Sequence, residues 1–160
     1  MDAAELEHWR ALYAGISPED DTFDMFGFPI HLSPNLVWVE SRDPLRTLPG
    51  SQHAELVEPG GTLGPAFVTK HIEIQFASRH IPAETHLLCL ADRTRLEEDP
   101  TSETAPVEVH GQVYGTAHVP VALVDAAFEQ VFATGRVTVH PVDPGKFKQL
   151  EKMRQIRKDP

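Results

Sequence analysis

The chain has 160 residues, of which 41% are hydrophobic and 24% are charged, and its formal net charge is -10. This length is typical of one domain with its own core, and this composition excludes wholesale disorder. No apolar run reaches the ~18 residues that a membrane-spanning helix needs, and the N-terminal MDAAELEHW lacks the basic and apolar regions of a signal peptide. We therefore expect a cytoplasmic protein, or one incorporated into a particle assembled in the cytoplasm.

The charge is distributed unevenly along the chain. Residues 146–160 contain six basic and two acidic residues, a net charge of +4, which leaves -14 on residues 1–145. An acidic body of this kind repels anionic lipid and nucleic-acid backbones, so we expect no membrane partner and disfavour nucleic acid. Docking of the basic segment on an acidic protein surface fits both signs of charge.

Residues 1–16 predict an N-terminal helical arm. Asp2 is a suitable N-cap, and Glu5 stands three residues later, as in a capping box. Leu6, Trp9 and Tyr13 recur at helical spacing and form one apolar stripe. A short isolated helix is marginal in water, so we expect this stripe to be covered by a partner. The acidic residues 17–24 that follow are interpreted as a linker.

Residues 26–143 predict an antiparallel β core. Segment 40–65 contains four prolines and four glycines, and 92–106 is acidic, so both are interpreted as long loops that contact partner chains. Between them, Lys70 to Ala91 alternates apolar and polar residues on either side of Pro82, which predicts a core hairpin. Cys89 lies among leucines, where we expect a buried structural thiol.

The last third of the chain predicts strands around one late helix. Residues 107–115 alternate like a strand that turns at Gly115, and residues 136–142 read as a closing strand. Between them, Pro120 suits the first turn of a helix over 120–134, and Gly135 suits its C-terminal end. The buried face of this helix would consist of Val124, Ala127, Phe128 and Val131.

Residues 145–158 predict a basic C-terminal helix after Pro144 and Gly145. Its apolar residues recur at a spacing of three and, like the N-terminal stripe, are expected to contact other chains. Packing of this helix on its own domain is an alternative of about equal weight. They are Phe147, Leu150, Met153 and Ile156.

These elements define one domain over residues 1–160. The order has no regular strand-helix alternation, which disfavours a parallel doubly wound sheet. We expect an α+β, mainly β fold: a small antiparallel barrel or sandwich with N-terminal, late internal and C-terminal helices.

One arrangement of residues suggests a metal site. His71 and Glu73 are two residues apart on a predicted strand and so share a face, as in the His-x-carboxylate half of a facial triad. A third ligand would come from a later strand; the candidates are His110, His118 and His140. We favour a solvent-exposed polar face of the sheet, without a cofactor, over a bound divalent metal.

Catalytic motifs are absent from the sequence. It has no Gly-x-Ser-x-Gly, Gly-x-Gly-x-x-Gly, phosphate-binding loop, His-Glu-x-x-His or Cys-x-x-Cys pattern, and no catalytic residue is identified. We therefore favour a non-enzymatic assembly or protein-interaction subunit, either a homo-oligomer or part of a larger complex. A phage particle is one example of such a complex, suggested only by the type of fold. The alternative is a small β-barrel enzyme or ligand-binding protein with the His/Glu metal site.

Overall fold

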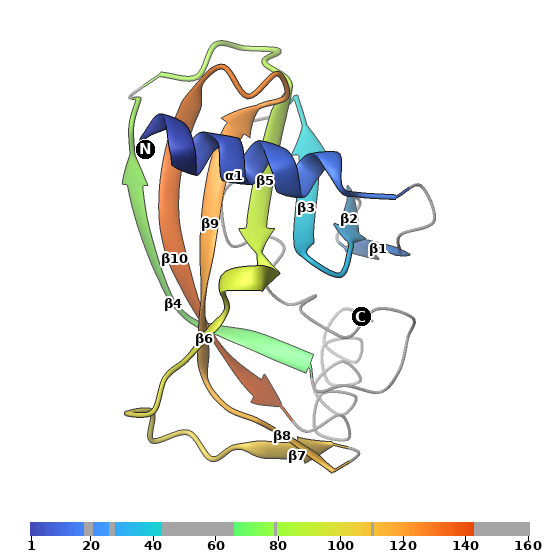
Figure 1. Cartoon of the computed structure of the whole chain (residues 1–160), viewed down its shortest axis with the longest axis vertical. Helices are drawn as coiled ribbons and strands as arrows, with labels where there is room; N and C mark the ends of the chain where they lie inside the picture. The colour runs from blue at the N-terminus through green and yellow to red at the C-terminus, as the bar shows by residue number, and fades with distance from the viewer. Residues whose placement is uncertain (18–20, 26–27, 43–65, 79, 110, 143–160) are drawn as a thin grey trace, which may run out of the picture.

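The computed structural model of the chain describes residues 1–17, 21–25, 28–42, 66–78, 80–109 and 111–142. Within these residues it contains one α-helix, α1 (Ala3–Ala14), together with an antiparallel sheet. Figure 1 shows α1 lying across one face of that sheet. The prediction of a mainly β fold is confirmed, and the described strands form an open path with two ends.

The main sheet places strands from distant parts of the chain side by side. Its order is β1-β2-β3-β5-β9-β10-β4, with every neighbouring pair antiparallel. Small elements flank it: the 3-10 helix η2 (Arg93–Arg95), β6 (Glu97–Glu98), which pairs with β9, and the separate hairpin of β7 (Val107–Val109) and β8 (Gln112–Tyr114). The strands of the main path are β1 (Asp21–Met25), β2 (Phe28–Leu32), β3 (Leu36–Ser41), β5 (Leu87–Asp92), β9 (Ala117–Asp125), β10 (Val131–Val142) and β4 (Ala66–Phe76).

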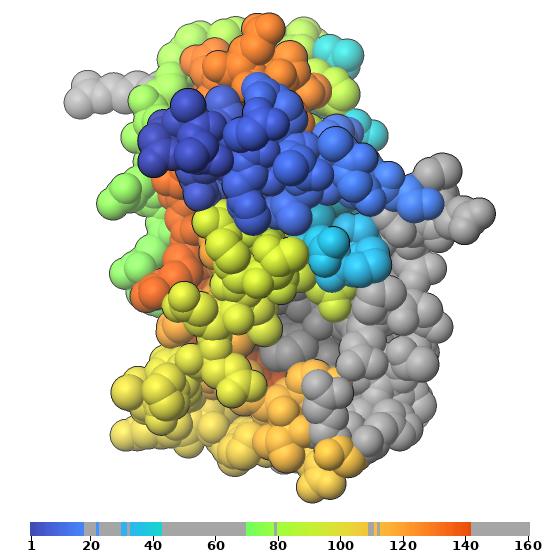
Figure 2. All heavy atoms as spheres, viewed as in Figure 1, coloured from blue at the N-terminus to red at the C-terminus, as the bar shows by residue number. Residues whose placement is uncertain are grey.

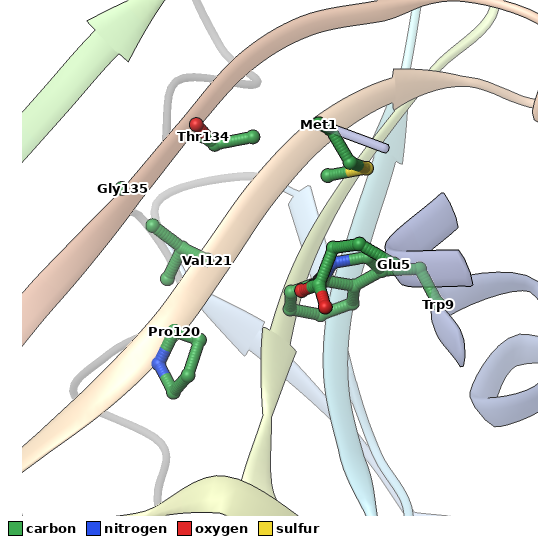
Figure 3. Close-up of a pocket in the computed structure, with 7 residues that line it drawn as sticks. All are labelled: Met1, Glu5, Trp9, Pro120, Val121, Thr134 and Gly135. Carbon is green, nitrogen blue, oxygen red and sulfur yellow. Dashed lines mark hydrogen bonds between the residues drawn. The ribbon is translucent and has the colours of Figure 1, made fainter. Parts of the chain in front are cut away.

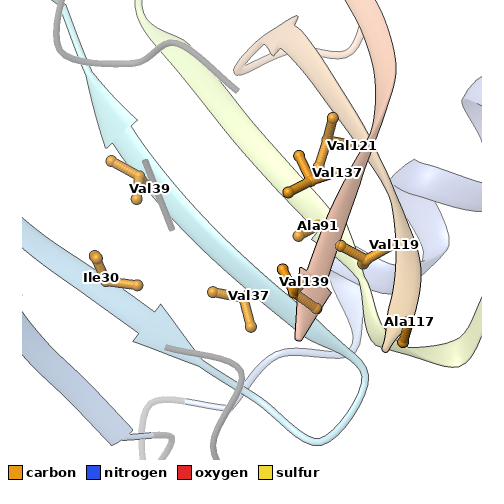
Figure 4. Packing of buried hydrophobic residues seen from close by; sticks show 9 residues of the cluster. All are labelled: Ile30, Val37, Val39, Ala91, Ala117, Val119, Val121, Val137 and Val139. Carbon is orange, nitrogen blue, oxygen red and sulfur yellow. The ribbon is translucent and has the colours of Figure 1, made fainter. Parts of the chain in front are cut away.

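Apolar side chains are buried on both faces of the central strands. One face packs against α1, and every residue of β5 is buried. On the opposite face, side chains of β2 and β3 point into the same interior as those of β5, β9 and β10 (Figure 4). This second cluster consists mostly of β-branched residues, as suits a pleated surface; its members are Ile30, Val37, Val39, Ala91, Ala117, Val119, Val121, Val137 and Val139.

The predicted helix over residues 120–134 is wrong. The structure has β9 and β10 there, joined by a tight loop in which the Asp125 carboxylate accepts hydrogen bonds from the backbone N–H groups of Glu129 and Gln130 at 2.8 and 2.7 Å. Residues 121–124 of β9 are all buried, because both faces of this strand are covered. A strand buried on both faces loses its polar alternation, so the remaining apolar spacing resembled that of a helix.

Three finer predictions also need correction. Lys70 to Ala91 does not form a hairpin, because β4 pairs with β10 at the edge of the sheet while β5 lies between β3 and β9. The predicted linker at 17–24 contains most of β1. The turn expected at Gly115 lies earlier, before Gln112, where Gly111 has a left-handed φ of 79°.

Two predicted features lie outside the described residues: most of the 40–65 loop, and the C-terminal helix over 145–158. In the part of the chain that the structure describes, no helix is long and apolar enough to cross a membrane. Cys89 is buried, as expected.

Candidate functional site

The outer edge of β4 is the most exposed apolar feature of the described sheet. β4 ends the strand order and pairs with β10 on one side, and no described strand pairs with its other side. Ile72 is 42% exposed and Phe76 is 61% exposed. On the opposite face of the strand, His71 and Glu73 have side chains that are each 63% exposed. Residues 70–76 of β4 lie along one margin of the molecule (Figure 2), and β4 and β1 lie at opposite ends of the sheet (Figure 1).

The backbone direction of β4 follows from one hydrogen bond at its end. The Ala77 N–H donates to the Phe132 carbonyl at 2.8 Å, so Ala77 faces β10. In an antiparallel ladder the N–H and C=O groups of alternate residues point to the same side. The backbone N–H and C=O groups of Glu73 and Gln75 therefore point toward β10. Those of Ile72, Ile74 and Phe76 point toward the free edge.

A glycine lets β4 approach β10 closely. Gly135 stands opposite Ile74, and a Cβ at Gly135 would lie 2.1 Å from the Glu73 carbonyl oxygen and 2.7 Å from Ile74 Cδ1. Such distances are far below van der Waals contact, and the first involves backbone. Any side chain at this position would therefore push β4 away from the sheet.

We expect Gly135→Ala to lower the free energy of unfolding by about 2 kcal/mol, because the added methyl forces the two strands apart. Urea unfolding followed by circular dichroism measures this change. Gly115→Ala is the matched control, since a Cβ there meets nothing within 4 Å and the residue is not in the left-handed region. Equal stability of the two variants would contradict the close packing of β4 on β10.

His71 and Glu73, the predicted metal pair, lie on this exposed strand. His71 Nε2 is 3.7 Å from Glu73 Oε1, and Arg136 Nη2 of the neighbouring strand is 4.0 Å from Glu73 Oε2. The pair therefore lies in solvent on the polar face of β4. Surface pairs of this kind contribute little to stability.

His118 has other partners. Its Nδ1 lies 2.7 Å from the Thr138 hydroxyl, and its Nε2 lies 3.3 Å from Asp99 Oδ2. The register places His71, Thr138 and His118 in one row across β4, β10 and β9, with Thr138 in the middle. His140 follows two residues after Thr138 and so shares this face.

The predicted ligands His71, Glu73, His118 and His140 do not form one metal-binding cluster in the described structure. Among the described residues, no group of three or more His, Cys, Asp or Glu side chains is placed to hold a metal ion. His110, the remaining candidate ligand, lies outside those residues.

The N-terminal apolar stripe is covered within the chain. Trp9 is 1% exposed, and Leu6 and Tyr13 pack with it against Trp38 and Phe128. The Tyr13 ring meets the Trp38 ring edge-on at a centroid distance of 5.2 Å. This packing gives no support to the prediction that the stripe contacts a partner. The corresponding tail residues lie outside the described part; they are Phe147, Leu150, Met153 and Ile156.

Sequence reasoning missed a polar cluster that joins α1 to the end of β5, which we call the α1 anchor: Glu5, His8, Asp92 and Arg95. Asp92 is fully buried, and its Oδ2 lies 2.7 Å from His8 Nε2 and accepts a 2.6 Å hydrogen bond from Arg95 Nε. Arg95 also donates two hydrogen bonds to the Glu5 carboxylate, at 2.7 and 3.0 Å. The anchor therefore holds the helix to the sheet through paired charges.

The anchor predicts acid sensitivity. Burial alone would raise the pKa of Asp92, but hydrogen bonds from Thr94, His8 and Arg95 outweigh it and lower that pKa. The hydrogen bond from Arg95 lowers the pKa of Glu5 against the opposing effect of burial. A carboxylate whose pKa is lower in the folded chain contributes stability that is complete above its ordinary value and is lost below it.

We therefore expect the unfolding free energy to fall as the pH drops below the ordinary values of 4.5 for Glu5 and 3.8 for Asp92. Urea unfolding between pH 7 and pH 3 measures the slope. Asp92→Asn should flatten this slope, because the substituted side chain no longer binds a proton. An identical acid slope in the variant would show that Asp92 is not the group responsible.

A shallow pocket of about 200 Å³ lies between the start of α1 and the sheet. Figure 3 shows Met1, Glu5 and Trp9 on one side of it and residues of β9 and β10 on the other. The Glu5 carboxylate is already bonded to Arg95 and Trp9. We therefore assign no ligand to this pocket.

Comparison with known proteins does not identify a family for this chain. No protein-family model matches it, and no curated protein matches it. Among solved structures, the chain is similar to the Escherichia coli PaaI protein from the phenylacetic acid degradation operon, with 15% sequence identity and a TM-score of 0.41. That alignment covers 86% of this chain and 92% of the PaaI chain. At this level of similarity, the likeness carries no functional argument.

Proposed function

We propose that this chain is a non-enzymatic protein-interaction or assembly subunit, and that it joins other chains through the free edge of β4. The observation that carries the proposal is the exposed pair Ile72 and Phe76 on a strand whose outward backbone groups have no described strand beside them. An edge of this kind is a template for pairing with another chain. Strand addition of this type combines backbone hydrogen bonds with side-chain specificity.

The opposite end of the sheet supports the proposal by contrast. β1 has five residues, two of which are aspartates, whereas β4 has eleven residues. Short, charged edge strands are a common protection against unwanted pairing. On β4 protection of this kind comes from the exposed Glu73 and from a bulge: the register with β10 shifts between Thr138 and Val139, which leaves Lys70 without a partner across the ladder. Residues 71–76 beyond this bulge remain regular and accessible.

Photo-crosslinking in cells that produce the chain tests this proposal. A photoreactive amino acid at position 76 should form an adduct with a second polypeptide, because the Phe76 side chain would lie in the interface. The same amino acid at position 113 is the control, since Val113 is 58% exposed but belongs to the separate β7-β8 hairpin. Absence of an adduct at position 76, or equal adducts at both positions, would contradict an interface on β4.

A metal-binding or ligand-binding role is the second candidate function. One observation favours it: His71, His118 and His140 project from the same face of three neighbouring strands, and the buried His140 Nδ1 has no hydrogen-bond partner among the described residues. His118 would have to leave Thr138 and Asp99 to act as a ligand. Stoichiometric iron, manganese or zinc in the purified protein, lost in His71→Ala, would favour this role over the first. Metal-free protein with an unchanged fold would exclude the metal site.

A further inference from the structure

We infer that the chain that pairs with β4 is a second copy of this chain, aligned antiparallel about a two-fold axis at Ile74. This inference rests on the proposed function and specifies its partner and register. In such a homodimer the two sheets would continue into one another across the β4 edges. The same surface patch would serve both subunits, as a closed two-fold interface requires.

The side-chain pattern of the edge is self-complementary about Ile74. From residue 72 to residue 76 it reads Ile, Glu, Ile, Gln, Phe: apolar residues at both ends and in the centre, with polar residues between them. Antiparallel pairing about Ile74 places Ile72 of each subunit opposite Phe76 of the other, so this contact occurs twice in the dimer. The two exposed large apolar side chains among residues 70–76 of β4 would then cover each other. Cross-strand aromatic and β-branched pairs are among the favourable ones in sheets.

The polar face of the same pairing is also compatible. Glu73 would stand opposite the partner's Gln75, whose amide donates to a carboxylate without bringing two charges of the same sign together. On its other side Glu73 already lies beside Arg136, with 4.0 Å between Glu73 Oε2 and Arg136 Nη2. The acidic side chain would therefore have a cation on one side and an amide donor on the other.

The backbone supports this register as well. Ile72, Ile74 and Phe76 are the residues whose N–H and C=O groups face outward, and the axis at Ile74 pairs each of them with another outward-facing residue. Ile72 exchanges hydrogen bonds with the partner's Phe76, and Ile74 with the partner's Ile74. No outward group between residues 72 and 76 is then left without a partner.

Neighbouring registers are less favourable. An axis at Glu73 would place this carboxylate directly opposite the partner's Glu73, and like charges in that position are destabilising. An axis at Ile72 would place Lys70, where the β4 ladder is interrupted by the bulge, opposite the partner's Ile74. It would also leave Phe76 without Ile72 as its apolar counterpart. These comparisons favour the axis at Ile74 over axes at Ile72 and Glu73.

The dimer itself is tested by light scattering of the purified chain over a range of concentrations. The expected mass is twice that of one chain, and Phe76→Lys should raise the dissociation constant at least about 100-fold, because two buried aromatic contacts are lost for each dimer. Val113→Lys is the matched control and should change it less than about twofold, because Val113 is as exposed as Phe76 but lies off this edge. A monomer at all concentrations would overturn the inference.

The register is tested by mixing two single-cysteine variants. Ile72→Cys mixed with Phe76→Cys should form a disulfide under mild oxidation, since opposite residues of a hydrogen-bonded pair have Cα atoms about 5.5 Å apart. Each variant alone should not, because its two cysteines would be four residues apart along the strand, about 13 Å. The native Cys89 is fully buried and does not interfere. Crosslinking of Ile72→Cys alone would place the axis at Ile72 and overturn the register, as would a dimer that shows no crosslink in the mixture.

The outcomes separate this inference from the proposed function. An adduct at position 76 in cells together with a monomeric purified chain would mean that β4 binds a different protein, so that the function stands and the homodimer fails. A monomer without any adduct would contradict both. A light-scattering dimer that is insensitive to Phe76→Lys would overturn the β4 interface while leaving an oligomer formed elsewhere.

Discussion

Replacing Trp9 with alanine is expected to lower the free energy of unfolding by about 3–5 kcal/mol, the range for deleting a large buried aromatic side chain. Trp9 is 1% exposed and packs into the cluster that joins α1 to β3, β5 and β9. Its indole N–H donates to Glu5 at 3.1 Å, and the Arg95 guanidinium lies 5.4 Å from its ring centroid. The substitution would therefore leave a cavity and also disturb the α1 anchor.

Urea unfolding followed by near-UV circular dichroism measures this loss. Glu7→Ala is the control on the same helix: Glu7 is exposed and pairs with Arg10 at the surface, so its removal should change stability by less than about 0.5 kcal/mol. If Trp9→Ala were as stable as Glu7→Ala, α1 would not be packed on the sheet and would again be a candidate arm for contact with other chains.

Replacing Asp92 with alanine is expected to cost about 3 kcal/mol, because several hydrogen bonds to a buried carboxylate are lost together. Its Oδ1 accepts from both the backbone N–H and the hydroxyl of Thr94, at 2.8 and 2.5 Å, and its Oδ2 binds His8 and Arg95. The substitution therefore releases the 3-10 turn after β5 and one attachment of α1 at the same time.

A double-mutant cycle separates these contributions. Asp92→Asn keeps the shape and an acceptor for Thr94 but removes the charge that binds Arg95, so an intermediate loss is expected. Combined with Arg95→Met, it should show a coupling energy of at least about 0.5 kcal/mol, as neighbours in one charge network do. Strictly additive losses would show that the two side chains are not coupled in solution.

The helix α1 was predictable because its signals are local. Asp2 caps it as expected, with its carboxylate accepting from the Glu5 N–H at 2.8 Å, and the apolar spacing correctly identified the buried face. The Glu5 side chain, however, binds Arg95, ninety residues away in the sequence. Spacing along one helix could not reveal that partner, nor that the stripe would be covered by the chain's own sheet.

The strand pair β9 and β10 shows where periodicity fails. Alternation of apolar and polar residues identifies a strand when one of its faces is exposed to solvent. Neither face of β9 is exposed over residues 121–124. The loop between the strands was also hard to predict, because Phe128 adopts a left-handed φ of 56°, a conformation uncommon for a bulky residue. Neither fact is visible in a pattern of apolar residues.

The candidate interface on β4 was half predictable. The apolar-polar alternation correctly indicated a strand over residues 71–76, and alternate residues of a strand, here Ile72, Ile74 and Phe76, share one face. That pattern is the same for a central strand and for an edge strand. The position at the edge depends on the order of strands in the sheet, which follows from pairing between distant segments. The same limit applies to the α1 anchor. For its Asp92, the sequence offered only the local signal of an aspartate two residues before Thr94.

Amide hydrogen exchange at β4 tests the central claim most directly. Glu73 and Gln75 face β10, so their amides should be protected whether or not a second chain is bound, whereas the amides of Ile72, Ile74 and Phe76 have no described strand to bind. We expect these three outward-facing amides to be protected in the wild-type chain at high concentration and to lose that protection in Phe76→Lys. Rapid exchange of all three in the wild-type chain at every concentration, beside protected amides at Glu73 and Gln75, would contradict an interface at this edge.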